Sequence, residues 1–115
     1  MKVIIAGGRD FNNYETLYKL CDKVLSNQTE IEIVSGTANG ADKLGEKYAN
    51  EKGYVIKRFP ANWEDFGKKA GIIRNREMAD YADALIAFWD GKSRGTKNMI
   101  EVAKKNKLEV RVIKY

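Results

Sequence analysis

The stretch "DALIAFWDGKSRGT", Asp83 to Thr96, decides the fold because it joins an apolar run to a glycine-rich loop. Its first half, Asp83–Trp89, is apolar on both faces, which is typical of a buried strand in a parallel sheet. The loop that follows contains Gly91 and Gly95, and a helix is predicted over Thr96–Asn106. A strand, a loop and a helix in this order form the repeating unit of an α/β sheet.

The same unit recurs along the rest of the chain. Strands are predicted at Lys2–Ala6, Ile31–Gly36, Tyr54–Phe59, Asp83–Trp89 and Glu109–Tyr115. Helices are predicted at Tyr14–Ser26, Asn39–Glu51, Lys69–Tyr81 and Thr96–Asn106, with a loop over Pro60–Phe66. The alternation predicts one α/β domain over residues 1–115. We expect a Rossmann-like, three-layer arrangement of about five mostly parallel strands with helices on both faces.

Composition narrows the class of protein. A chain of 115 residues suits one domain, and its 43% hydrophobic and 32% charged content is typical of a globular protein. No apolar run approaches the roughly 20 residues that span a bilayer, and the apolar patch at the start is too short for a signal peptide. We therefore expect a cytoplasmic location. Cys21 is the single cysteine, so no internal disulfide can form, and its helical spacing favours a core position.

The chain contains no histidine, which excludes Ser-His-Asp and Cys-His mechanisms. With one cysteine and no histidine a zinc site is not expected, and we expect neither a metal nor a resident cofactor. The formal charge of +5 and the pI of about 9.3 favour anionic partners, although lysines that solvate the surface would give the same values.

Loops rich in glycine, small hydroxyls and arginine follow the predicted strands, where α/β sheets bind their ligands. The candidate ligand-binding residues in these loops are Gly7, Gly8, Arg9, Asp10, Ser35, Gly36, Thr37, Gly40, Asp42, Trp63, Arg74, Asn75, Asp90, Gly91, Arg94, Gly95 and Thr96. The glycines allow a ligand to approach the main chain. Asn39 is a candidate cap for its helix, and Gly91, Gly95 and Thr96 resemble a phosphate nest followed by a cap.

Three of these side chains have two interpretations each. Asp42 could pair with the dipole of its helix, or it could accept a ribose hydroxyl or fix Arg9. Arg74 could lie on a solvated face or fork onto a phosphate. Trp63 could cover the edge of the sheet or stack on a base.

The segments "AGGRDF", "VSGTANGAD", "FPANW", "AGIIRNREM" and "ADALIAFWDGKSRGTKNMI" resemble, in this order, the SLOG superfamily. This Rossmann-like group includes the LOG phosphoribohydrolases and the Smf/DprA proteins. Within it the chain is most similar to the YspA-like family, also described as domain of unknown function 2493. The resemblance implies a nucleotide or nucleotide derivative as ligand, and it favours a homo-oligomer.

The LOG enzymes cleave the N-glycosidic bond of nucleoside monophosphates with an arginine and the glutamate of a Gly-Gly-x-Gly-Thr-x-x-Glu loop. Arg74 matches that arginine and Gly95-Thr96 match the Gly-Thr pair, but Met99 occupies the glutamate position. Glu101 comes two residues later, about 200° around the helix, and should not face the same cleft. Asp10, Asp90 and Glu101 are the candidate catalytic carboxylates, since a glycosidase needs one.

The leading hypothesis is a binding module for a phosphate-containing nucleotide derivative, such as an NAD-like or ADP-ribose-like molecule or a modified nucleotide. It would act as a sensor or sequestering protein. One alternative is an enzyme, a nucleoside-monophosphate N-glycosidase. Another is a single-stranded DNA binder, although the sequence has no basic stripe interleaved with aromatics, so nucleic acid is the less favoured partner.

Overall fold

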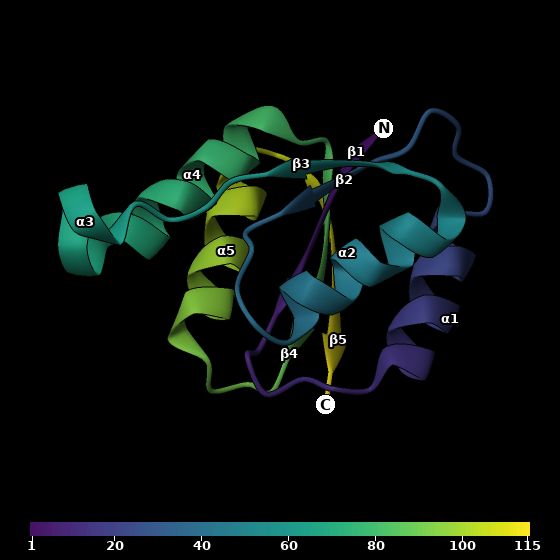
Figure 1. The fold of residues 1–115 in the computed structure, drawn as a ribbon, viewed down its shortest axis with the longest axis horizontal. Coiled ribbons are helices and arrows are strands. Elements are labelled where there is room, and N and C mark those ends of the chain that lie inside the picture. The colour runs from purple at the N-terminus through teal and green to yellow at the C-terminus, as the bar shows by residue number, and fades with distance from the viewer.

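Five parallel strands form one sheet in the order β3-β2-β1-β4-β5 in a computed structural model that describes residues 1–115 (Figure 1). The strands are β1 (Lys2–Gly7), β2 (Glu32–Ser35), β3 (Val55–Arg58), β4 (Ala84–Trp89) and β5 (Glu109–Lys114). The helices are α1 (Tyr14–Leu25), α2 (Ala41–Lys52), α3 (Trp63–Phe66), α4 (Ala70–Tyr81) and α5 (Arg94–Lys105). The predicted Rossmann-like α/β fold is confirmed.

Successive side chains of β1 enter different cores because side chains alternate across a strand. Val3 and Ile5 belong to the core that α1 and α2 cover, whereas Ile4 and Ala6 belong to the core under α4 and α5. Figure 1 shows these two pairs of helices on opposite faces of the sheet. Burial on both faces explains why the central strands are continuous apolar runs.

The segment between β3 and α4 differs from the predicted loop at Pro60–Phe66. It contains the short helix α3 and a 3₁₀ turn, η1 (Gly67–Lys69). Asn62 caps α3, since its side chain accepts a hydrogen bond from the amide of Asp65 at 3.1 Å. A helix of one turn has no periodicity, so this cap was the one signal that could have predicted it.

Two helix starts also differ from the prediction. Asn39 does not cap α2: the N-cap is Gly40, at φ 77°, and no side chain caps that end. A Cβ at Gly40 would lie 2.2 Å from the carbonyl oxygen of Gly8, so the left-handed turn also permits close packing. Helix α5 begins at Arg94, not Thr96, because Ser93 is its N-cap and accepts from the amide of Thr96.

The strand order places the switch point between β1 and β4, since the chain turns toward β3 on one side of β1 and toward β5 on the other. Ligands in open parallel sheets bind beyond the carboxyl ends of the strands at such a point. None of the helices has the length and apolar character needed to cross a membrane.

Candidate functional site

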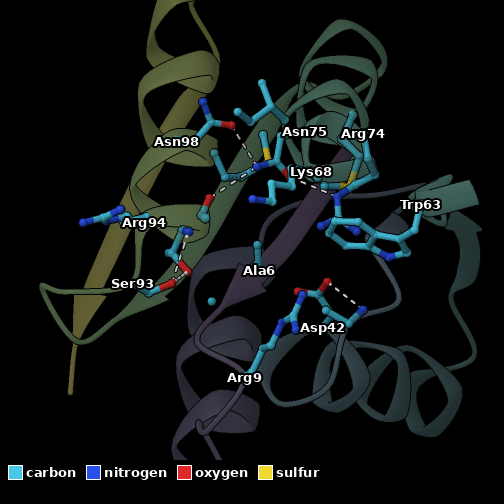
Figure 2. A pocket seen from close by; sticks show the side chains of 18 residues that line it. Ala6, Arg9, Asp42, Trp63, Lys68, Arg74, Asn75, Ser93, Arg94 and Asn98 are labelled. Carbon is cyan, nitrogen blue, oxygen red and sulfur yellow. Dashed lines mark hydrogen bonds between the residues drawn. The ribbon is translucent and has the colours of Figure 1, made fainter. Parts of the chain in front are cut away.

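A cavity of about 300 Å³ opens at the carboxyl end of β1, between the N-terminus of α5 and the α3–α4 segment (Figure 2). We call it the first cavity. Its polar and charged lining residues are Arg9, Asp42, Lys68, Arg74, Asn75, Ser93, Arg94, Thr96 and Asn98. Its apolar lining includes Ala6, Trp63, Ile72, Met78 and Met99, with Gly7, Ala38, Gly71 and Gly95 completing the wall.

The lining of the first cavity is strongly cationic. Four basic residues line it together with one carboxylate, and the basic residues are Arg9, Lys68, Arg74 and Arg94. The carboxylate is Asp42, which takes part in none of the ion pairs of the protein. Basic groups converging in a concave, partly apolar site attract and orient an anion.

Arg74 on α4 is held against the loop that follows β2. Its guanidinium donates through Nη1 to the carbonyl of Gly36 and through Nε to Oδ1 of Asn75 at 3.0 Å. A Cβ at Gly36 would lie 2.7 Å from Nη1 of Arg74 and 2.8 Å from Oδ2 of Asp42. A larger residue at Gly36 would therefore displace the end of the arginine or of the carboxylate side chain.

Asn75 connects α4 to the start of α5. Its Nδ2 donates to Oδ1 of Asn98 at 3.0 Å and to the carbonyl of Gly95 at 3.3 Å, and the residue is only 6% exposed. The first amides of α5 thereby keep a fixed position relative to Arg74. Helix N-termini of this kind favour negative charge, because their amides lack partners within the helix.

Asp42 lies in the first turn of α2 and is 5% exposed. Burial raises the pKa of its carboxyl to about 6, although the amide of Ala38 and the charges of Arg74 and Arg9 act in the opposite direction. The carboxylate thus loses much of its hydration and gains no ion pair in return. Both interpretations of Asp42 from the sequence, a dipole partner and a ligand-facing acceptor, agree with this position.

A second network, of hydrogen bonds and an ion pair, holds the loop that follows β2. The hydroxyl of Ser35 donates to Oε2 of Glu46 at 2.6 Å and accepts from the amide of Thr37 at 3.1 Å. Arg58 on β3 completes the network with a 3.0 Å ion pair to Glu46. Thr37 has φ 65°, which is uncommon for a β-branched residue. The network therefore stabilises a strained turn beside the candidate site.

Most of the predicted ligand-binding residues come together in space. Those that line the first cavity are Gly7, Arg9, Asp42, Trp63, Arg74, Asn75, Arg94, Gly95 and Thr96. Gly36 and Thr37 line an adjoining cavity that shares part of the same wall. The residues that line neither cavity are Gly8, Asp10, Ser35, Gly40, Asp90 and Gly91.

The three candidate catalytic carboxylates all lie outside the cavity lining. Asp10 accepts a hydrogen bond from the hydroxyl of Tyr115 at 2.6 Å. Asp90 accepts from the amides of Ser93 and Lys92, which lower the pKa of its carboxyl, so it organises the turn before α5. Glu101 is exposed on α5, as its helical position predicts. The carboxylate that does line the cavity is Asp42.

Some lining residues were missed from the sequence, chiefly Lys68, Ser93 and Asn98. Ser93 carried a readable signal, because a serine directly before a helical segment is a preferred N-cap. Asn98 lies five residues after Ser93, and its Oδ1 accepts a hydrogen bond from Nδ2 of Asn75. Lys68 belongs to the unpredicted η1 turn, so its direction could not be derived.

A family model described as the YspA, cpYpsA-related SLOG family matches residues 1–66. The chain belongs to this family. The Gene 61 protein of Mycobacterium phage D29 is a relative that is 33% identical over 111 residues, covering 90% of this chain and 89% of the relative. The residues of this chain that the family model matches include four that line the first cavity: Gly7, Arg9, Asp42 and Trp63.

Two solved structures of DNA processing protein A share the fold. The protein from Streptococcus pneumoniae superposes with a TM-score of 0.78 at 20% identity, over 96% of this chain and 49% of that one. The Helicobacter pylori protein, described with a single-stranded DNA binding mode, gives 0.68 at 21% identity, over 97% of this chain and 64% of that one. This chain therefore spans about half to two thirds of the length of these proteins.

Proposed function

We propose that the protein binds a phosphate-containing nucleotide or nucleotide derivative in the first cavity and acts as a sensor or sequestering module. The observation that carries this proposal is that four basic residues, Arg9, Lys68, Arg74 and Arg94, line a cavity at the switch point of the sheet. Membership of the SLOG family supports the same class of ligand.

Each part of a nucleotide has a matching group in the lining. The amides at the start of α5 and the side chain of Arg94 suit a phosphate. Trp63, which is 52% exposed, offers an aromatic surface to a base. Asp42 is the acceptor available for sugar hydroxyls, and Asn75 is engaged in holding the two helices together.

The first experiment is mass spectrometry of small molecules released from the purified, denatured protein, combined with isothermal titration against a panel of nucleotides. We expect an intact nucleotide, with no turnover. Free base and ribose phosphate appearing during the titration would instead identify an N-glycosidase, and Asp42 would then be its candidate carboxylate because it lines the cavity.

Arg94→Gln is the most informative variant, because Arg94 is at the cavity rim and its exposed side chain has no hydrogen bond or ion pair that would hold it away from a ligand. We expect about a tenfold loss of affinity for a nucleotide with unchanged stability. Lys104→Gln is the matched control, since it removes an exposed cation from the last turn of the same helix. Equal affinities in the two variants would contradict the proposal.

Single-stranded DNA is a second candidate ligand, favoured by the likeness to a protein described with that binding mode and by the +5 charge. It predicts that affinity for an oligonucleotide falls steeply as salt rises, because phosphate contacts release counterions. A mononucleotide that competes fully with the oligonucleotide would assign both ligands to the same cavity.

We also propose a cytoplasmic homo-oligomer. Phe66 on α3 is 48% exposed and lines neither cavity, so it offers an apolar surface that a second copy could cover. Light scattering of the purified protein would give the mass, and a monomer at all concentrations would contradict this part of the proposal.

A further inference from the structure

A second cavity of about 360 Å³ adjoins the first, above the ends of β2 and β3. Its lining is Arg9, Gly36, Thr37, Ala38, Asn39, Pro60, Ala61, Trp63 and Arg74. Four of these residues, Arg9, Ala38, Trp63 and Arg74, also line the first cavity. We call these four residues the shared wall. The two cavities therefore form one groove along the carboxyl edge of the sheet.

The shared wall holds the groups that best recognise a nucleotide linkage. Arg9 and Arg74 supply two guanidinium groups at the middle of the groove, and both are free of ion pairs. Trp63 lies beside Arg74, since a Cβ at Gly71 would be 3.6 Å from the indole and 4.0 Å from the guanidinium (Figure 2). A linking phosphate would lie on the arginines, and a base would stack on the tryptophan.

The two ends of the groove differ in chemistry. The first cavity continues to the cationic start of α5 at Ser93 and Arg94. The second cavity has the apolar Pro60 and Ala61 together with the side chains of Thr37 and Asn39, and no carboxylate lines it. A neutral nucleoside, with an apolar face and hydrogen-bonding edges, suits that second end.

The volumes of the two cavities also favour a ligand with two nucleosides. Small-molecule sites commonly occupy about 300 to 1,000 Å³, so each cavity alone is at the small end of that range. A mononucleotide would fill one cavity and leave the other to solvent, with the arginines of the shared wall at its edge. A molecule of two nucleosides joined through phosphate would fill both and place its central charge on those arginines.

We infer that the ligand is a dinucleotide unit, with one nucleoside in each cavity and the linking phosphate on Arg9 and Arg74. This inference rests on the proposed nucleotide-binding function and narrows its ligand class to molecules with two nucleosides. A free dinucleotide and a segment of a single strand contain the same unit, and experiment distinguishes the two sources.

The test narrows each cavity with its own substitution. The affinities for AMP and for adenylyl-adenosine are then measured by isothermal titration. Ala61→Leu narrows the second cavity. Gly71→Leu narrows the first, and its Cβ would make ordinary van der Waals contact, 3.6 Å from the indole of Trp63. We expect adenylyl-adenosine to bind the unaltered protein about tenfold more tightly than AMP. Ala61→Leu should abolish that difference without changing AMP affinity, whereas Gly71→Leu should weaken both.

Two results would overturn the inference and leave the proposed function intact: AMP binding as tightly as adenylyl-adenosine, or Ala61→Leu weakening neither ligand. If neither compound binds, both proposals fail together. Thermal unfolding of each variant checks its folding, and Asn39→Ala repeats the test of the second cavity from an exposed position. A longer oligothymidylate that binds more tightly than thymidylyl-thymidine identifies a strand as the source, and equal affinity identifies a free dinucleotide.

Discussion

Asp42 and Glu46 lie four residues apart on α2 and are almost equally buried, at 5% and 7% exposure, yet their surroundings differ. Burial raises the pKa of Glu46, but the hydroxyl of Ser35 and the ion pair with Arg58 outweigh it and hold the pKa below its ordinary value. Asp42 has one backbone amide as a partner, and burial keeps its pKa raised.

The difference separates a carboxylate that serves the fold from one that is available to a ligand. Glu46 is satisfied by side chains of β2 and β3 and lines neither cavity. Asp42 faces Arg9 and Arg74 across the first cavity without an ion pair to either. Perturbed ionisable groups in a cleft are candidates for function, whereas fully paired buried groups are candidates for structure.

Glu46→Ala should have the largest effect on stability. It leaves the hydroxyl of Ser35, which is 1% exposed, without its acceptor, and it removes the partner of Arg58. We expect the free energy of unfolding to fall by about 3 kcal/mol, measured by urea denaturation. Glu77→Ala, at an exposed position of α4, is the control and should stay within about 0.5 kcal/mol of the unaltered protein. A similar loss of unfolding free energy in both variants would show that Glu46 does not stabilise the fold more than an exposed glutamate does.

Asp42→Asn should change stability in the opposite direction. A carboxyl whose pKa rises on folding to about 6 makes the folded state less stable as pH increases from about 4 to 6, because folding disfavours its ionised form. The amide retains shape and can still accept from Ala38, so we expect a gain of about 2 kcal/mol at pH 7. The gain should nearly vanish at pH 3, where the carboxyl is mostly protonated in both states. Urea denaturation of both proteins at the two pH values tests this, and a loss of stability at pH 7 would contradict the comparison.

Binding of a phosphodiester should depend on the same carboxyl. Protonation of Asp42 removes the negative charge that faces Arg74 from α4 and Arg9 from the loop after β1, with Glu46 one turn further along α2. The protonated carboxyl still accepts from a sugar hydroxyl through its carbonyl oxygen, so we expect affinity to rise by about fivefold, or about 1 kcal/mol, between pH 7.5 and 5. The chain has no histidine, and a diester does not titrate in this range, so few other groups can contribute. Titration calorimetry should show no such rise in Asp42→Asn; a rise that persists in this variant would assign the effect elsewhere.

The sequence was sufficient to predict a mostly parallel sheet and most of the cationic lining, because strands ended by glycine define where the loops converge. The strand order, and with it the position of the switch point, came from the structure. The sequence was not sufficient to show that Glu46 is paired within the fold whereas Asp42 is available to a ligand. The partner of Glu46, Arg58, comes from β3, and no periodicity in α2 indicates that contact. Asp10 accepts a hydrogen bond from Tyr115, 105 residues away, and no local pattern in the sequence indicates that contact. Long-range polar pairs of this kind are a product of the fold.

Arg58→Gln should have the smallest effect on the free energy of unfolding. It tests most directly whether the role of Glu46 is separate from that of Asp42. The arginine side chain is 53% exposed, so solvent screens its ion pair with Glu46, and we expect a loss of at most about 1 kcal/mol in urea denaturation. Arg111→Gln is the matched control, since it removes an exposed arginine from β5, the opposite edge strand. Because the Ser35–Glu46 hydrogen bond remains, AMP affinity should be the same in both variants. Weaker binding in Arg58→Gln alone would show that the Glu46 network positions the Thr37 turn for the ligand, and the two carboxylates of α2 would then serve one site.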